Sequence, residues 1–299
     1  MKIAFQTVDV FTDRRFGGNP LAVIPDARGL TSEQMQAIAA EFNLAETTFV
    51  LPPQNPANTA HVRIFTPKAE MPFAGHPNVG TAYVLARAGA VLGRKMVGDK
   101  LVFEEIAGLV AMRLLKGGTE IYGAQLKAPQ PLNVGDEVAL EQIANACGLS
   151  VADIETKHHT PCLAGCGNWF VFAELNNREA LKRAMYVTDA FARDFPMSKT
   201  IGIHLYVRTS SDEVDVQSRM FAPLYGVPED PATGSANVAL VGLIAHSDKK
   251  DRLDLRIAQG VDMGRPSILE AEAIRDAEGR IECYIGGGCV PVMRGEIEL

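Results

Sequence analysis

Two stretches of the chain share one pattern, and this pattern decides the predicted fold. Residues 63–80 read RIFTPKAEMPFAGHPNVG, and residues 219–239 read RMFAPLYGVPEDPATGSANVA. Both contain Arg-x-Phe-x-Pro, a short spacer, and then Glu-x-Pro-x-x-Gly-x-x-Asn-Val before an apolar run. Upstream of each, GGNPLAV at 17–23 is similar to CGNWFVF at 166–172. Because these matches recur in the same order, they indicate a duplicated domain.

The elements around the repeats predict an α+β fold. Alternating segments before each Arg-x-Phe-x-Pro predict strands, and the apolar run after each glycine turn predicts a helix that is buried on all sides. We therefore expect two lobes related by a pseudo-twofold axis, each a mixed β-sheet wrapped around a central buried α-helix. The first lobe is assigned to 1–118, with the strand at about 288–299 as a candidate to return to it, and the second lobe to 119–287.

A capping box marks one further helix in the first half. Thr31 is followed by Gln34, and Met35, Ile38 and Phe42 then recur at helical spacing. Such a polar pair ahead of a periodic apolar segment predicts the start of an amphipathic helix. This helix should end near Asn43.

Composition excludes several classes of protein. The 299 residues carry 29 Lys and Arg against 36 Asp and Glu, a net charge of −7, whereas a general nucleic-acid binder needs a basic surface. No apolar run approaches the roughly 18 residues of a membrane span, and the start lacks the apolar core of a signal peptide. The five cysteines are too few for a disulfide scaffold, so we expect them to be buried in a cytoplasmic protein.

The turns AGHP (74–77) and TGSA (233–236) predict an anion-binding site. Each turn begins a helix, where free backbone N–H groups and the helix dipole attract negative charge. Gly75 and Gly234 would let a ligand approach the backbone closely, and equivalent loops of two lobes would meet across a cleft that holds a small carboxylate. The alternative is a pair of tight strand-to-helix turns with no ligand. A nucleotide site is not favoured, because no GxGxxG or Walker pattern is present.

The residues immediately before the two glycines argue against one mechanism. Diaminopimelate epimerases have a two-lobed fold of this kind, and they move a proton with paired cysteines set just before the glycines of these turns. Here the matching positions hold Ala74 and Thr233, and none of the five cysteines lies near either turn. The sequence therefore does not favour a two-cysteine racemase.

Four other polar residues are candidates for proton transfer. Glu46 lies between a predicted helix and a strand, where partial burial would suit it to general acid/base work. His76, Asp230 and Ser235 lie beside the turns, as a proton shuttle or as ligands of a carboxylate. Each also has an ordinary interpretation. Glu46 could be a surface glutamate, His76 and Ser235 helix caps, and Asp230 a helix-entry carboxylate.

The remaining histidines do not predict a metal site. His158, His159 and His204 have no carboxylate or cysteine beside them at ligand spacing. We interpret the first two as a solvated loop pair and the third as a strand residue. His61 and His246 are likewise not interpreted as metal ligands.

At these residues the chain resembles the PhzF, or phenazine-biosynthesis-like, family. The matching strings are DVFTDRRFGGNPLAV, AIAAEFNLAETTFV and the two repeated stretches. The resemblance implies a diaminopimelate-epimerase-like fold, a homodimer and an isomerase without cofactor or metal, in which one glutamate moves a proton within a small carboxylate substrate. By motif position, that glutamate is Glu46. The resemblance assigns further catalytic roles to His76 and Asp230 and substrate binding to Gly75, His76, Gly234 and Ser235, and we add Asn19 to the binding set.

Two functions follow as hypotheses. The first is a cofactor-independent isomerase with Glu46 as the single acid/base. The second is a non-catalytic protein that binds or senses a small acid in the same cleft. Exchange of a bound substrate C–H with D₂O would exclude the second. In either case the attraction for an acidic ligand must be local, at the helix termini, because the net charge of −7 would repel it.

Overall fold

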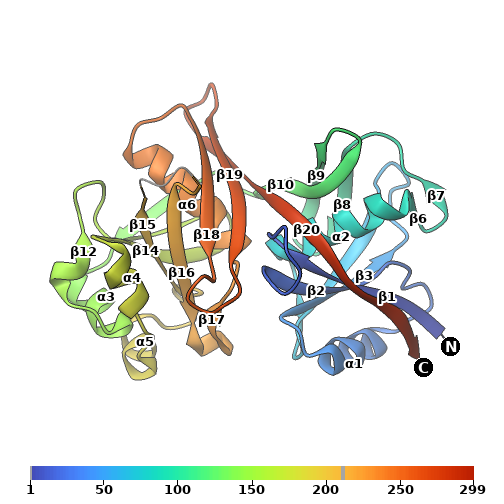
Figure 1. The fold of residues 1–299 in the computed structure, drawn as a ribbon, viewed down its shortest axis with the longest axis horizontal. Coiled ribbons are helices and arrows are strands. Elements are labelled where there is room, and N and C mark those ends of the chain that lie inside the picture. The colour runs from blue at the N-terminus through green and yellow to red at the C-terminus, as the bar shows by residue number, and fades with distance from the viewer. Residues whose placement is uncertain (1, 210–212) are drawn as a thin grey trace. The chain divides into compact units, whose positions relative to one another are not determined.

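The computed structural model describes residues 2–209 and 213–299, which form an α+β fold with more strands than helices (Figure 1). Contacts divide the chain into two compact units. Unit 1 is Met1–Lys127 together with Gly286–Leu299, and unit 2 is Ala128–Ile285. The sequence placed the boundary after residue 118. The strand that follows this position, Glu120–Lys127, pairs antiparallel with Gly108–Gly117 and belongs to unit 1.

Unit 1 consists of strands around one buried helix. The chain's last strand pairs antiparallel with its first, over the register Lys2↔Glu298 to Val10↔Cys289. The elements of this unit are β1 (Lys2–Val10), β2 (Asn19–Ile24), α1 (Ser32–Phe42), β3 (Glu46–Leu51), β4 (Ala60–Phe65), β5 (Glu70–Met71), α2 (Gly75–Ala88), β6 (Ala90–Val91), β7 (Arg94–Lys95), β8 (Lys100–Glu105), β9 (Gly108–Gly117), β10 (Glu120–Lys127) and most of β20 (Ile281–Glu298).

The predicted capping box begins α1. The Thr31 hydroxyl accepts a hydrogen bond from the Gln34 backbone N–H at 3.2 Å, and the Gln34 side chain accepts one from the Thr31 N–H at 2.9 Å. Two of the N–H groups that a helix start leaves open are thereby satisfied. The helix ends at Asn43, whose φ of 50° takes the left-handed conformation typical of a C-cap.

Helix α2 forms the centre of unit 1. Every residue from Gly75 to Ala86 is buried, as the apolar run predicted. The helix packs closely on β1 and β2 at Gly80, where a Cβ atom would lie 2.6 Å from Leu21 Cδ2 and 2.8 Å from Val10 Cγ2. Only a residue without a side chain allows this approach.

Unit 2 holds a second buried helix, α6 (Gly234–Ser247), which is apolar nearly all round. It packs on strands β13, β14, β18 and β19, and Figure 1 shows it beside β18 and β19. The other described elements of this unit are β11 (Asn133–Glu137), α3 (Leu140–Cys147), β12 (Ile154–Glu155), β13 (Cys162–Gly165), β14 (Trp169–Leu175), α4 (Arg178–Arg183), α5 (Thr188–Asp194), β15 (Ile203–Arg208), β16 (Val216–Ala222), β17 (Val227–Asp230), β18 (Arg252–Gln259) and β19 (Ser267–Arg275), with short 3₁₀ turns at Val151–Asp153 and Pro223–Tyr225.

The repeated sequence pattern makes a defined set of contacts in unit 1. Arg63 on β4 forms two parallel hydrogen bonds with the carboxylate of Glu70, at 2.6 and 2.7 Å. Its guanidinium lies 5.0 Å from the centre of the Phe65 ring. Further along, the Asn78 side chain donates to the carbonyl of Ala74 at 3.0 Å and closes the first turn of α2.

Unit 2 makes the same contacts at the matching positions. Arg219 on β16 binds Glu229 through two hydrogen bonds of 2.8 and 2.9 Å, and its guanidinium lies 4.9 Å from the centre of the Phe221 ring. The Asn237 side chain donates to the carbonyl of Thr233 at 3.0 Å. The Arg, Phe, Glu and Asn of the repeat therefore fasten a strand to the turn that begins a buried helix, once in each unit.

The cysteines agree with the expectation from composition. All five cysteines are buried and free. In the described part of the chain, none of the helices has the length and apolar character needed to cross a membrane.

Candidate active site

Glu46 and His76 meet in unit 1. Glu46 is the first residue of β3, which pairs parallel to β2, and His76 is the second residue of α2. Oε2 of Glu46 lies 3.4 Å from Nε2 of His76, and the two side chains are 18% and 7% exposed. Glu46 is thus not a surface glutamate. The strand end and the helix start bring together two groups that are 30 positions apart in the sequence.

The protonation state of His76 follows from its surroundings. Burial lowers the pKa of His76 to about 3, despite a hydrogen bond from the ring to the Pro20 backbone, so the imidazole is neutral near pH 7. Nε2 makes no hydrogen bond of normal geometry among the described residues. The ring N–H that Pro20 accepts is therefore that of Nδ1, and Nε2 turns its lone pair toward Glu46.

Asn19 and Gly75 also lie in unit 1. Asn19 is the first residue of β2 and is 2% exposed. Gly75 is the first residue of α2, and it is buried. Because Gly75 belongs to a right-handed helix, its backbone does not need the left-handed freedom of glycine. What the glycine provides is the absence of a side chain beside the helix N-terminus.

Asp230, Gly234 and Ser235 lie in unit 2. Asp230 ends β17 and accepts a 2.6 Å hydrogen bond from the Thr233 hydroxyl. Gly234 is the first residue of α6 and is buried, like Gly75 in α2. The interpretation of Ser235 as the N-cap is wrong, since Thr233 holds that position and Ser235 is the second residue of the helix. Ser235 therefore does not occupy the position from which a side chain caps the helix.

Comparison with known proteins identifies the family. The sequence matches the model of the phenazine biosynthesis-like proteins (PhzC-PhzF) over residues 8–295. The chain belongs to this family.

Individual relatives match over nearly their whole length. A protein of Mesorhizobium japonicum named as an uncharacterized isomerase is 38% identical over 299 residues, covering 97% of this chain and 96% of the relative. The trans-2,3-dihydro-3-hydroxyanthranilate isomerase of Pseudomonas chlororaphis is 35% identical, covering 98% of each chain. The crystal structure of a PhzF-family protein of Bacillus anthracis superposes with a TM-score of 0.90 and 26% identity, covering 100% of both chains.

The PhzF-family motifs did not point to Gln259, which ends β18 in unit 2. Its amide nitrogen donates to the Asp230 carbonyl at 2.7 Å and to the Thr233 hydroxyl at 3.0 Å. Its oxygen accepts from the Thr233 backbone N–H at 3.2 Å and from the Asn237 side chain at 2.6 Å. The sequence did hold a signal, because strand alternation places Gln259 on the same face as the buried Ile257.

The interpretation of His158 and His159 as a solvated loop pair is wrong. Nδ1 of His158 lies 3.0 Å from both carboxylate oxygens of Glu174, which is 4% exposed. Nε2 of His159 lies 2.7 Å from the hydroxyl of the buried Tyr206, which in turn donates to Glu174 at 3.1 Å. Burial lowers the pKa of His159 and raises that of Tyr206. Spacing along the chain gave no sign of Glu174, which comes from a different strand.

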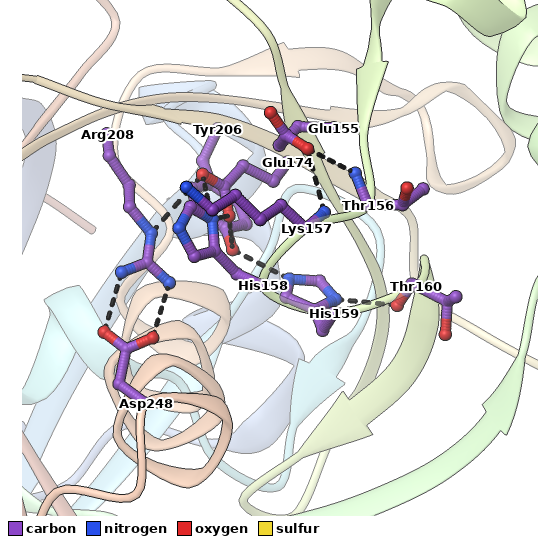
Figure 2. A network of polar contacts seen from close by, with 10 residues as sticks. All are labelled: Glu155, Thr156, Lys157, His158, His159, Thr160, Glu174, Tyr206, Arg208 and Asp248. Carbon is purple, nitrogen blue, oxygen red and sulfur yellow. Dashed lines mark hydrogen bonds and ion pairs between the residues drawn. The ribbon is translucent and has the colours of Figure 1, made fainter.

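Arg208 completes this polar network, which Figure 2 shows converging on Glu174. The Arg208 guanidinium forms two hydrogen bonds with Asp248, at 2.7 and 3.0 Å, and its Nε lies 3.3 Å from Glu174. Such partners offset part of the cost of removing a carboxylate from water. The network thus ties β14 and β15 to the loop after β12 and to the end of α6.

The other histidines lie apart from this network. His204 is a strand residue of β15, as predicted, and it is completely buried, with Nε2 3.2 Å from Asn237 Oδ1. Burial lowers the pKa of His204 to about 3. His61 lies on β4 and His246 in the last turn of α6. Over residues 2–209 and 213–299, no group of three or more His, Cys, Asp or Glu side chains is arranged to hold a metal ion.

Proposed function

We propose that this PhzF-family chain is a cofactor-independent isomerase that moves a proton between two carbons of a small carboxylate, with Glu46 as the single acid/base. The observation that carries the proposal is the Glu46–His76 pair, 3.4 Å apart and largely buried beside the first turn of α2. A largely buried carboxylate near a helix N-terminus is the kind of group that exchanges a proton with a bound substrate.

The pair holds one mobile proton in this proposal. Nε2 of the neutral His76 lies 3.4 Å from Glu46, so a carboxyl O–H on Glu46 can donate to it. When a substrate binds, the same proton is available for a carbon atom, and Glu46 can later recover a proton from another carbon.

Substrate binding is assigned to backbone groups and short side chains. In unit 1 these are Gly75, His76 and Asn19, and in unit 2 they are Gly234 and Ser235. The free N–H groups at the start of α2 and α6 suit a carboxylate. Asp230 is proposed as the further catalytic residue of unit 2.

The relatives suggest the first substrate to test. Several are named as trans-2,3-dihydro-3-hydroxyanthranilate isomerases, including those of Pseudomonas chlororaphis and Pseudomonas fluorescens. This compound carries the small carboxylate that the site is proposed to bind. We therefore infer a cyclic carboxylate of this class for the present chain.

The experiment measures both deuterium incorporation into the substrate and conversion to product. The wild-type protein, Glu46→Gln and the control Glu41→Gln, an exposed residue of α1, are each incubated in D₂O with trans-2,3-dihydro-3-hydroxyanthranilate. NMR then records incorporation at carbon and conversion. Wild type and Glu41→Gln should isomerise the substrate, and Glu46→Gln should be slower by about 10²–10⁴-fold.

Two results would contradict the proposal. Turnover by Glu46→Gln at the wild-type rate would remove Glu46 as the acid/base. Tight binding of small carboxylates by wild type, without exchange at carbon for any of them, would favour the non-catalytic binding protein instead. The homodimer is a separate prediction, which light scattering coupled to gel filtration tests.

A further inference from the structure

The internal repeat gives Gln259 a counterpart in unit 1. Strand β16 pairs parallel to β18, with Val216 opposite Ile257 and Ser218 opposite Gln259. Strand β4 pairs parallel to β8 in the same way, with Ala60 opposite Phe103. Since Arg63 matches Arg219 in the repeat, Ala60 matches Val216 and Phe103 matches Ile257. Counting two residues further along each strand, the counterpart of Gln259 is Glu105.

Gln259 shows what this position does in unit 2. Its side chain is completely buried and uses both donor hydrogens and both acceptor positions, all on the turn that begins α6. An amide is suited to this task because it donates from one end and accepts at the other. Gln259 is therefore a positioning residue for the turn that carries Asp230 and Gly234.

Glu105 stands in a similar place but with different chemistry. The turn between β8 and β9, which follows Glu105, is tied to the segment before α2 through the Ala107 N–H, which donates to the Pro72 carbonyl at 3.0 Å. Both Glu105 carboxyl oxygens are buried, and so is Oδ1 of Asn78 in the first turn of α2. None of the three accepts a hydrogen bond of normal geometry from the described residues. A buried carboxylate whose oxygens lack well-formed hydrogen bonds would cost free energy.

We propose that Glu105 is the positioning residue of the α2 turn and that it does this work as a neutral carboxylic acid, with its O–H in place of the Gln259 amide N–H. A protonated carboxyl group has the shape of an amide and, like it, combines one donor end with one acceptor end. The proton converts one of the clustered acceptors into a donor, and the Asn78 side chain is a hydrogen-bonding neighbour of the Glu105 carboxyl group. Because the Asn78 side chain also binds the Ala74 carbonyl, Glu105 would hold the residues immediately before Gly75 and His76.

Among the described residues, burial and the Asn78 side chain set the pKa of Glu105, and no cation contributes to it. Opposite it on β9 is Gly108, and the neighbouring β9 residues Leu109 and Val110 are not titratable. Glu104 on its own strand is engaged by the backbone N–H groups of Gln54 and Asn55. The histidines on the adjacent elements are His61 on β4 and the neutral His76 on α2.

Burial gives the neutral form a wide pH range. It raises the pKa of Glu105 to about 8, with the Asn78 side chain offsetting part of the rise. In the unfolded chain the pKa returns to about 4.3. Between these values Glu105 binds more protons in the folded protein than in the unfolded one, so the contribution of Glu105 to stability falls as pH rises. Through Glu105, the unfolding equilibrium constant should increase by up to about tenfold for each pH unit, and this increase should stop above about pH 8.

The first test is urea unfolding from pH 5 to 9 of wild type, Glu105→Gln and two control variants. Glu105→Gln should remove the decline, so that its advantage over wild type grows with pH up to about 8 and is constant above. Gln259→Glu, the reverse exchange in unit 2, should introduce a decline of the same sign. The second control is Glu104→Gln. In wild type the Asn58 side chain and the Asn55 and Gln54 N–H groups lower the pKa of the Glu104 carboxylate, so this variant should not gain stability over wild type as pH rises. Parallel curves for wild type and Glu105→Gln would overturn the proposal.

The second test addresses positioning and rests on the proposed function. Glu105→Ala should lower kcat for trans-2,3-dihydro-3-hydroxyanthranilate, and Glu105→Gln should restore most of it. The wild-type profile should decline above about pH 8, whereas the Glu105→Gln profile should lack this decline. Equal rates for the Ala and Gln variants, with equal profiles, would overturn the positioning role. If wild type does not turn over any carboxylate but the unfolding curves behave as expected, the proposed function fails while the neutral Glu105 is supported.

Discussion

Oε2 of Glu46 lies 3.4 Å from Nε2 of His76, and burial keeps the imidazole neutral. This relationship separates two roles that the sequence left open for His76. It is neither a helix cap, since its side chain faces Glu46 and Pro20, nor a cation for the substrate. It can accept a hydrogen bond from the Glu46 carboxyl group and so hold that group in place while it reacts.

The His76→Asn variant should therefore lose turnover while still folding. We expect kcat to fall by about 10²-fold, because Glu46 loses the acceptor that orients its proton. The wild-type pH–rate profile should show no inflection near pH 6.5, since His76 titrates near pH 3. Steady-state kinetics with trans-2,3-dihydro-3-hydroxyanthranilate measures kcat and the pH–rate profile. An inflection near pH 6.5 that His76→Asn abolishes would show that the imidazole titrates in the functional range.

The two buried histidines should make the protein sensitive to acid. Burial lowers the pKa of His76 and of His204 to about 3, against about 6.5 in an unfolded chain. Between these values the unfolded chain binds more protons, so stability is lost as pH falls below about 6.5. Each histidine should contribute a slope of up to about 1.4 kcal/mol per pH unit.

Unfolding of wild type and His204→Asn between pH 4 and 7 tests this slope. The variant should lose less stability than wild type as the solution is acidified. His246→Asn, which changes an exposed histidine of α6, is the matched control and should follow the wild-type curve. Equal slopes for wild type and His204→Asn would mean that His204 does not carry the acid sensitivity.

The two arginines of the repeat should differ in importance. Both bind a glutamate through two hydrogen bonds, and Arg63 also donates through Nη1 to the Ser32 hydroxyl at 3.0 Å. Arg219 instead donates through Nη1 to the backbone carbonyls of Leu181, Lys182 and Ala184, at 2.9, 3.1 and 2.7 Å. Arg219→Met should cost about 3–5 kcal/mol, because it leaves a largely buried Glu229 and three carbonyls without their donor. Arg63→Met should cost about 1.5–3 kcal/mol. Urea unfolding compares them, and a larger loss for Arg63→Met would contradict this account.

A methyl group at Gly80 should destabilise unit 1. The added Cβ would lie 2.6 Å from Leu21 Cδ2 and 2.8 Å from Val10 Cγ2, so the helix and the strands would have to separate. We expect Gly80→Ala to cost about 1–3 kcal/mol. Gly117→Ala is the control, because the nearest atom to its Cβ is 3.9 Å away, and it should change stability by no more than about 0.5 kcal/mol. Thermal unfolding of the two variants distinguishes them.

Much of the fold was predictable because its signals are local. The capping box at Thr31 and Gln34, the buried helices α2 and α6, and the strands before them all follow from periodicity and cap chemistry over a few residues. The repeat also marked the Arg, Phe, Glu and Asn positions that form the same contacts in both units. The repeat did not predict which of these residues bind each other, because the spacing alone does not indicate that Arg63 binds Glu70.

The sequence by itself determined which residues could do chemistry, and tertiary structure decided what surrounds them. Glu46 and His76 were candidates from their motifs, but only the parallel pairing of β2 and β3 beside α2 brings them to 3.4 Å and buries them. Glu105 and Gln259 did not stand out in the sequence, because their role depends on strand register. A side chain's charge and hydrogen bonding are set by burial and by neighbours from distant segments, and these exist only once the chain has folded.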